Sequence, residues 1–284
     1  MFFVKKTGFT EFTHSLHRPD TIYLIQYGAV NEHGRNRSEK EITMSDIHYR
    51  HEIKHEITRS DLIAISQGLR AVAQTDPHVK DGRYLIRSLY FDNIYDKALR
   101  EKIDGVNMRE KFRIRYYNND PSVIHLEKKS KVNGLGTKYS CSLTAAEAQR
   151  IAEGDIDWIA GTMTGEDRRP LLEELYCKMR YQGLRPQTIV DYTREPFIYK
   201  PGNVRVTFDY DIRTGLRCTD FLDPDCVMIP AVQPRTGDGS SGGTGIILEV
   251  KWDAYLPDII REVVQIHGRR EGAFSKYAAC RTYD

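Results

Sequence analysis

Residues 109–116 read Arg109-Glu110-Lys111-Phe112-Arg113-Ile114-Arg115-Tyr116, and this stretch decides the expected fold. In a β-strand alternate side chains share a face, so the four cations form one row with the apolar residues behind them. Neighbouring cations in such a row lie roughly 6.7 Å apart. At an effective dielectric of ~20 they repel each other by about 2.5 kcal/mol. A poorly solvated row therefore needs acids opposite it or an anionic ligand. We expect Arg113 and Arg115 to point into the interior of a curved sheet and Ile114 to pack under a helix on its outer face.

Other predicted strands repeat this alternation of charged and apolar residues. Residues 109–138 contain eight Lys and Arg but three Asp and Glu, whereas the whole chain has a net charge of only +2. Same-face charges recur at Glu52 and Lys54, at Glu127, Lys129 and Lys131, at Arg205 and Asp209, and at Glu249 and Lys251. A barrel whose interior is charged and whose apolar outer face packs on helices explains this alternation. A barrel with a conventional apolar interior remains an alternative, because periodicity alone does not exclude it.

The predicted elements are antiparallel strands interrupted by a few helices, which is typical of an α+β fold. Strands are expected at 50–57, 84–91, 108–117, 122–131, from near 138, and at 188–194, 204–210 and 246–251. Helices are expected after a cap at Ser60, from the Thr144/Glu147 capping box to about Glu153, and at 258–267. A further helix is expected from Leu171 to Gln182, with Pro170 before it and Gly183 at its end. About eight strands in one domain predict a closed antiparallel β-barrel with helices packed outside.

The ends of the chain and its composition set further expectations. Residues 1–45 follow no strand or helix period and are expected to be a disordered N-terminal extension, with the folded domain at 46–284. Met44 is an alternative start, which would make residues 1–43 an artefact. No apolar run is long enough for a membrane span or a secretory signal, and the near-neutral charge indicates no nucleic-acid partner. Five scattered cysteines predict reduced thiols in a cytoplasmic protein. Residues 237–242 match GxGxxG outside a strand–helix context and predict a flexible loop.

Six ordered segments carry a family resemblance. They are Ser88-Leu89-Tyr90-Phe91-Asp92-Asn93, Phe112-Arg113-Ile114-Arg115-Tyr116, Leu126-Glu127-Lys128-Lys129, Tyr192-Thr193-Arg194-Glu195-Pro196-Phe197, Leu248-Glu249-Val250-Lys251 and Phe274-Ser275-Lys276-Tyr277. Together they resemble the VTC domain, the polyphosphate polymerase branch of the triphosphate tunnel metalloenzymes, over residues 49–284. The resemblance implies a closed β-tunnel that transfers the γ-phosphoryl group of ATP to a growing polyphosphate chain and releases ADP.

The resemblance also implies site residues, carried over position by position. Catalytic contacts to the phosphates fall on Arg113, Arg115, Lys129, Arg194 and Lys276, and further substrate contacts on Lys54, Lys102, Lys138, Arg205 and Ser275. Glu249 is the implied ligand of a Mn²⁺ or Mg²⁺ cofactor. The first strand reads Glu52-Ile53-Lys54-His55-Glu56, which departs from the ExExK pattern of the wider superfamily and leaves the roles of Glu52 and Glu56 open.

Several alternatives stay open at this stage. The same tunnel would suit hydrolysis of tripolyphosphate or nucleoside triphosphates, with water as the acceptor. A non-catalytic module that binds polyphosphate or RNA is a third possibility. Lys129 and Glu127 could simply form a same-face ion pair. The expected partners are ATP and polyphosphate, together with a membrane protein for export of the product.

Overall fold

The computed structural model of the chain describes residues 51–77, 79, 81–133, 135–163, 168–232, 244–265 and 272–282. The predicted N-terminal extension and the 237–242 loop lie outside these residues.

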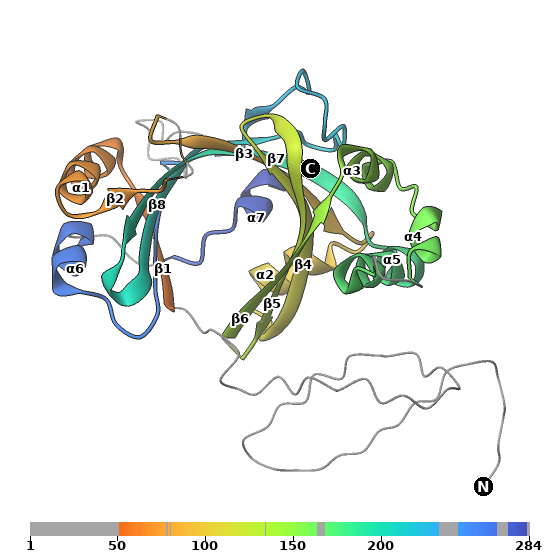
Figure 1. The fold of residues 1–284 in the computed structure, drawn as a ribbon, viewed down its shortest axis with the longest axis horizontal. Coiled ribbons are helices and arrows are strands. Elements are labelled where there is room, and N and C mark those ends of the chain that lie inside the picture. Colours follow the sequence, from red (N-terminus) through yellow and green to blue (C-terminus); the bar gives the residue numbers. More distant parts are fainter. Residues whose placement is uncertain are drawn as a thin grey trace, which may run out of the picture. The chain divides into compact units, whose positions relative to one another are not determined.

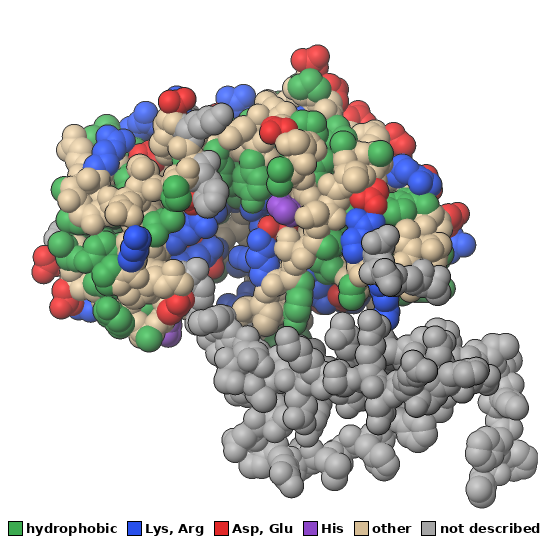
Figure 2. Space-filling model, in the orientation of Figure 1, with side chains coloured by type: hydrophobic (Ala, Val, Ile, Leu, Met, Phe, Trp, Pro, Cys, Tyr) green, Lys and Arg blue, Asp and Glu red, His purple; other side chains and the backbone are tan. Residues whose placement is uncertain are grey.

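The described strands form one antiparallel sheet in the order β1-β10-β8-β7-β3-β4-β5-β6, which is strongly curled (Figure 1). The space-filling view shows a hollow inside this curl (Figure 2). Its strands are β1 (His51–Ile57), β3 (Tyr84–Asp92), β4 (Met108–Tyr117), β5 (Asp120–Val132), β6 (Leu135–Leu143), β7 (Arg185–Tyr199), β8 (Val204–Thr214) and β10 (Ile246–Trp252). Two short strands, β2 (Gln74–Thr75) and β9 (Ile229–Pro230), pair with β7 and β8. Within the described residues, β1 and β6 end the sheet and are not paired with each other. The curl is therefore shown, and closure into a barrel stays a prediction.

The helices are α1 (Arg59–Val72), α2 (Lys97–Ile103), α3 (Ala145–Ala152), α4 (Asp157–Gly161), α5 (Pro170–Gln182), α6 (Asp258–Val264) and α7 (Lys276–Cys280), with a 3₁₀ turn η2 (Pro201–Asn203). The predicted cap at Ser60 is wrong. Thr58 caps α1, because its hydroxyl accepts from the Asp61 amide while the Asp61 carboxylate accepts from the Thr58 amide. The Thr144/Glu147 capping box of α3 is confirmed. The predicted end of α5 at Gly183 is also confirmed, and the φ of 66° at this residue is a left-handed conformation that favours glycine.

Two apolar clusters lie on the outer face of the sheet. One, the α3–α5 cluster, packs Ile114 and Leu126 under helices α3, α4 and α5. The other, the α1–α6 cluster, packs Leu248 and Val206 against α1 and α6 (Figure 1). Each fully buried aliphatic side chain stabilises the fold by ~1.5–3 kcal/mol. The outward packing of Ile114 is confirmed, and the charged positions of the same strands consequently face the hollow.

A third apolar cluster lies on the inner face and departs from the expectation that all helices pack outside. Helix α7 lies within the curl of the sheet (Figure 1), where Tyr277 stacks on Tyr90 with ring centroids 5.1 Å apart. The Tyr277 hydroxyl donates to Asp92 at 2.8 Å, and Asp92 also accepts from the amide of Leu99 in α2. These contacts hold the C-terminal segment, and with it Lys276, inside the sheet.

Candidate functional site

Lys and Arg side chains gather in the hollow of the sheet (Figure 2). The side chains of Arg113 and Arg115 are largely buried there, on the face of β4 opposite Ile114. The Arg115 guanidinium donates to the hydroxyls of Ser88 and Tyr192 at 2.9 and 3.0 Å. The expected inward direction of both arginines is therefore observed.

One side of the hollow is a wall formed by β4, β5 and β6, and Glu127 on β5 lies at its centre. Its side chain is 2% exposed and forms ion pairs with Arg113 at 2.6 Å, Lys138 at 2.5 Å and Arg115 at 4.0 Å. Burial raises the pKa of Glu127, but Arg113, Arg115 and Lys138 outweigh it and hold that pKa well below its usual range. Three cations therefore share the Glu127 carboxylate, and Lys129 is not one of them. The ion pair considered between Lys129 and Glu127 is not formed.

Lys111, Lys129 and Lys138 are directly opposite one another across β4, β5 and β6. Like charges in such positions destabilise a sheet. Only Lys138 of the three forms an ion pair with a described acid. Burial, followed by repulsion from Lys251, lowers the pKa of Lys129 well below its usual value, and burial lowers the pKa of Lys111 to about 8. The wall formed by β4, β5 and β6 is therefore short of negative charge.

Replacing Lys129 by Met is expected to lower the affinity for tripolyphosphate at least tenfold, about 1.4 kcal/mol, without lowering the melting temperature. The side chain is half-buried and has no acid in ion-pair contact among the described residues, so its removal relieves repulsion while it removes a phosphate contact. Calorimetric titration and thermal unfolding measure the two effects.

The matched control is Lys128→Met. Lys128 is next to Lys129 but faces outward, where it pairs with Glu110 and Glu174. This variant should lose stability and keep its affinity. If Lys129→Met instead unfolded more readily and bound normally, Lys129 would have a structural role.

Tyr90 on β3, opposite Arg113 of β4, is a residue beside this wall that sequence reasoning did not select. Its hydroxyl accepts from Arg113 at 2.9 Å, and the Lys111 ammonium lies 5.8 Å from the ring centroid. Burial raises the pKa of this phenol, but the charges of Arg113, Lys111 and Arg115 outweigh it and lower the pKa to about 7. The lowered pKa of Tyr90 indicates that positive charge exceeds negative charge around its hydroxyl.

The opposite wall, formed by β1, β10 and β8, has alternating charges. Glu249 on β10 is opposite Lys54 on β1, and Glu52 is opposite Lys251. The nearly buried carboxylate of Glu249 lies 3.0 Å from Lys251, 3.5 Å from Lys54 and 3.4 Å from Arg194. Burial raises the pKa of Glu249, but Lys251, Lys54 and Arg194 outweigh it and hold that pKa well below its usual range. Glu249 is thus ionised, with cations on several sides.

The described residues include no group of three or more His, Cys, Asp or Glu side chains placed to hold a metal ion. A hard divalent cation needs only one or two carboxylates when substrate phosphates supply its other ligands. Glu249 fits that requirement, because it offers an ionised oxygen donor in a hollow suited to polyanions. Of the two acids left open, Glu52 pairs with Lys54 at 2.5 Å, and Glu56 accepts from the Thr244 amide at the end of β1.

Asp209 on β8 was not selected from the sequence, yet it organises two of the predicted residues. Arg194 donates to both of its carboxylate oxygens, at 2.6 and 2.7 Å, and Lys276 of α7 lies 2.5 Å away. Burial raises the pKa of Asp209, but Arg194 and Lys276 outweigh it and lower the pKa to about 2. The alternation of Arg205 and Asp209 on one strand face was the signal that could have found it.

Arg205 lies further along the same face of β8, beside the alternating wall. Its guanidinium contacts Asp76 at 3.1 Å and the Tyr84 hydroxyl at 3.2 Å. Its Nε atom is buried and has no hydrogen-bond partner among the described residues. One N–H of the Arg205 guanidinium is thus left unpaired among the described residues.

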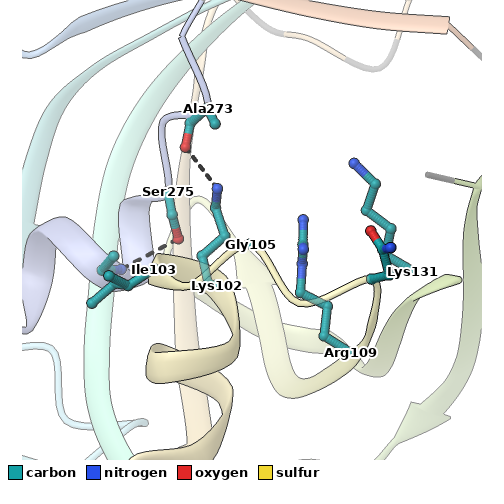
Figure 3. A pocket seen from close by; sticks show the side chains of 9 residues that line it. Lys102, Ile103, Gly105, Arg109, Lys131, Ala273 and Ser275 are labelled. Carbon is teal, nitrogen blue, oxygen red and sulfur yellow. Dashed lines mark hydrogen bonds between the residues drawn. The ribbon is translucent and has the colours of Figure 1, made fainter. Parts of the chain in front are cut away.

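Lys102 and Ser275 meet at a cavity of about 420 Å³ beside α2 and α7. Lys102 donates to the Ala273 carbonyl at 2.8 Å and lines this cavity with Arg109 and Lys131, as Figure 3 shows. None of these three cations forms an ion pair with a described acid. The Ser275 hydroxyl accepts from the Ala278 amide and so caps α7. The structure thus gives Ser275 a local role that the sequence did not predict.

The VTC domain model matches residues 49–283 of the chain. The chain belongs to the VTC domain family. This confirms the resemblance drawn from the six sequence segments, and with the curled, cation-lined sheet it supports a triphosphate tunnel enzyme. No curated protein matches the sequence.

Three solved structures resemble this VTC domain protein weakly. HpAC1 from Hippeastrum, which has a dominant triphosphatase activity, is 14% identical with a TM-score of 0.46, over 83% of this chain and 96% of that one. The bh2851 protein of Bacillus halodurans is 10% identical with a TM-score of 0.39, over 76% and 85%. PH1819 from Pyrococcus horikoshii OT3 is 13% identical with a TM-score of 0.35, over 76% and 84%. These likenesses are too weak to support a conclusion about activity.

Among the described residues of the VTC domain protein, no helix has both the length and the apolar character needed to cross a membrane.

Proposed function

We propose that this VTC domain protein synthesises polyphosphate by transferring the γ-phosphoryl group of ATP to the end of a growing polyphosphate chain, with release of ADP. The curled sheet would act as the tunnel that holds the chain, with residues 46–284 as the catalytic domain and residues 1–45 as an extension. A cytoplasmic location, where ATP and Mg²⁺ are available, suits this reaction.

The observation that carries the proposal is the opposition of Lys111, Lys129 and Lys138 across three strands. Glu127 neutralises part of this wall, and the cavity cations Lys102, Arg109 and Lys131 extend the unneutralised region. Such an arrangement is costly unless a polyanion binds to it. A phosphate chain supplies closely spaced negative charges along its length, and thus matches a row of cations better than a single carboxylate does.

The reaction needs positioning and charge neutralisation more than covalent help from the protein. An oxygen of the terminal phosphate of the growing chain attacks the γ-phosphorus of ATP. The new P–O bond forms as the bond to the bridging oxygen breaks, and ADP leaves with that electron pair. Arg113 and Arg115 would grip phosphate oxygens through their planar guanidinium groups. Because phosphate is the acceptor, no side-chain nucleophile is required.

Asp209 would act as a positioning residue in this scheme. By fixing Arg194 and Lys276 before substrate binds, it reduces the reorganisation needed when charge moves toward ADP. Glu249 would hold Mn²⁺ or Mg²⁺ together with phosphate oxygens, and the ion would neutralise charge on those oxygens.

The decisive experiment incubates the purified full chain with ATP and Mn²⁺ and separates the products on a gel stained for polyphosphate. Polymer together with ADP is expected. Free phosphate without polymer would instead assign hydrolysis in the same tunnel. Tripolyphosphate binding without turnover would assign a binding module.

The affinity for tripolyphosphate is expected to fall about tenfold between pH 7 and pH 9. Lys111 has a pKa of about 8 in the free protein, and a bound polyanion raises it, so binding takes up a proton above that pH. Rising pH therefore opposes binding. Calorimetric titrations across this range measure the effect.

Lys111→Arg is the control for this dependence, because arginine keeps the charge and does not deprotonate in this range. It should flatten the loss of affinity above pH 8. An identical pH profile in Lys111→Arg and the wild-type protein would show that Lys111 is not the group that titrates.

A further inference from the structure

The segment between β8 and β9 brings two cysteines together outside the charged hollow. The Sγ atoms of Cys218 and Cys226 lie 2.9 Å apart, and both side chains are half-buried. Both cysteines are free thiols in the structure.

The folded structure holds the two thiols in place through the residues between them. Phe221 is fully buried and packs edge-on against Tyr116, with ring centroids 4.8 Å apart. The Tyr116 hydroxyl donates to the Phe221 carbonyl at 3.1 Å, and Arg87 donates to the Asp223 carbonyl at 2.6 Å. Arg87 is itself fixed by Asp191. The approach of the sulfurs therefore results from a segment anchored to β3 and β4.

The contact between the two sulfurs places each thiol within reach of the other. Cys226 donates its S–H to the Cys218 sulfur, and burial, followed by that hydrogen bond, raises the pKa of Cys226 to about 12. The Cys218 thiol in turn donates to the Asp220 carboxylate at 3.7 Å. Exchange proceeds through a thiolate, and whichever cysteine reacts first with a disulfide already has the second sulfur beside it.

We propose that Cys218 and Cys226 form a dithiol redox site, which a small-molecule disulfide oxidises to an intramolecular disulfide. The thiolate of one cysteine attacks one sulfur of the oxidant, and the oxidant's S–S bond breaks to release one thiolate. The second cysteine passes its proton to the released thiolate, attacks the protein sulfur of the mixed disulfide and displaces the second thiolate. The two protein thiols lose two electrons and two protons, and the oxidant is reduced to two thiols. To form a bond of about 2.05 Å, the sulfurs must approach by roughly 0.9 Å.

This disulfide would clamp the segment that carries Phe221 onto the outer face of the sheet. Cross-linking a short loop stabilises a protein mainly by restricting its unfolded chain. We expect the melting temperature to rise by roughly 5 °C on oxidation. It should fall back to the value of the reduced protein when a dithiol reductant is added. The tunnel side chains lie on the other face of β4 and need not move.

The test uses the purified full chain incubated with oxidised glutathione, alkylated with N-ethylmaleimide and digested with trypsin. Cleavage after Arg217 and Arg235 yields one peptide, residues 218–235, that contains both Cys218 and Cys226 and no other cysteine. The expected peptide is unalkylated and lighter by two hydrogen atoms than its reduced form. The peptides with Cys141, Cys177 and Cys280 serve as controls in the same digest.

Two variants sharpen the result. Cys177→Ser removes an exposed thiol and should leave the oxidised 218–235 peptide unchanged. Cys226→Ser should replace the disulfide by a glutathione adduct on Cys218. The proposal is overturned if the wild-type peptide is alkylated twice, or takes up glutathione at both cysteines, under conditions that modify Cys177.

Discussion

Glu249→Gln is expected to abolish turnover with either Mn²⁺ or Mg²⁺ while the affinity for tripolyphosphate stays within about tenfold, ~1.4 kcal/mol. The substitution keeps the volume of the side chain and removes the charge that would hold the metal ion. Lys54, Lys251 and Arg194, which surround this carboxylate, remain to grip the polyanion, and one repulsive charge has gone. Turnover and calorimetric affinity, measured on the same preparation, separate the two effects.

Glu52→Gln is the matched control for Glu249→Gln. Glu52 shares Lys54 and Lys251 with Glu249, but its side chain is 30% exposed and makes no contact with Arg194 among the described ion pairs. It should lose less than about tenfold in turnover, which corresponds to ~1.4 kcal/mol. Near-normal turnover in Glu249→Gln would refute the metal assignment. Lost binding with normal turnover per bound substrate would indicate a structural role for Glu249.

Glu127→Gln is expected to reduce the free energy of unfolding by about 3–5 kcal/mol, because it leaves two largely buried arginines without their acid. Arg113, Arg115 and Lys138 all depend on this one carboxylate. Tripolyphosphate should restore much of the lost stability, since it returns negative charge to the same cations. Denaturant unfolding with and without tripolyphosphate measures both effects.

Glu110→Gln is the control on the outer face of the same wall. Glu110 pairs with Lys128 and Lys178, but its side chain is 27% exposed, so the expected loss is below about 1 kcal/mol. If Glu127→Gln were as stable as the wild-type protein, the three cations would not need an internal counter-charge.

The sequence predicted the strands best where charged and apolar residues alternate. β4 begins and ends at the predicted residues, Met108 and Tyr117. β7 extends well beyond the predicted 188–194, because pairing with β3 and β8 continues the strand through Pro186 and Pro196. Helices α2, α4 and α7 were missed because five to seven residues are too few to establish a helical period.

The candidate site was predictable in its cations and less so in its pairings. Alternation put Lys54, Arg113, Lys129 and Glu249 on charged faces, and the structure brings these faces together. Which acid neutralises which cation depends on strand order and register. The pairing of Asp209 with Arg194 and Lys276, and the lack of an acid beside Lys111 among the described residues, could therefore not be predicted. Tyr90 was missed for the same reason, since its environment comes from a neighbouring strand and from α7.

The two outer apolar clusters affect how parts of the protein unfold locally. The α1–α6 cluster covers β1, β10 and β8, whereas the α3–α5 cluster covers β4, β5 and β6. In native-state hydrogen exchange we expect each wall with its helices to open as its own cooperative unit, with the ladder between β3 and β7 joining the two. A polyanion held by cations of both walls would link the units, so that neither could open without releasing it.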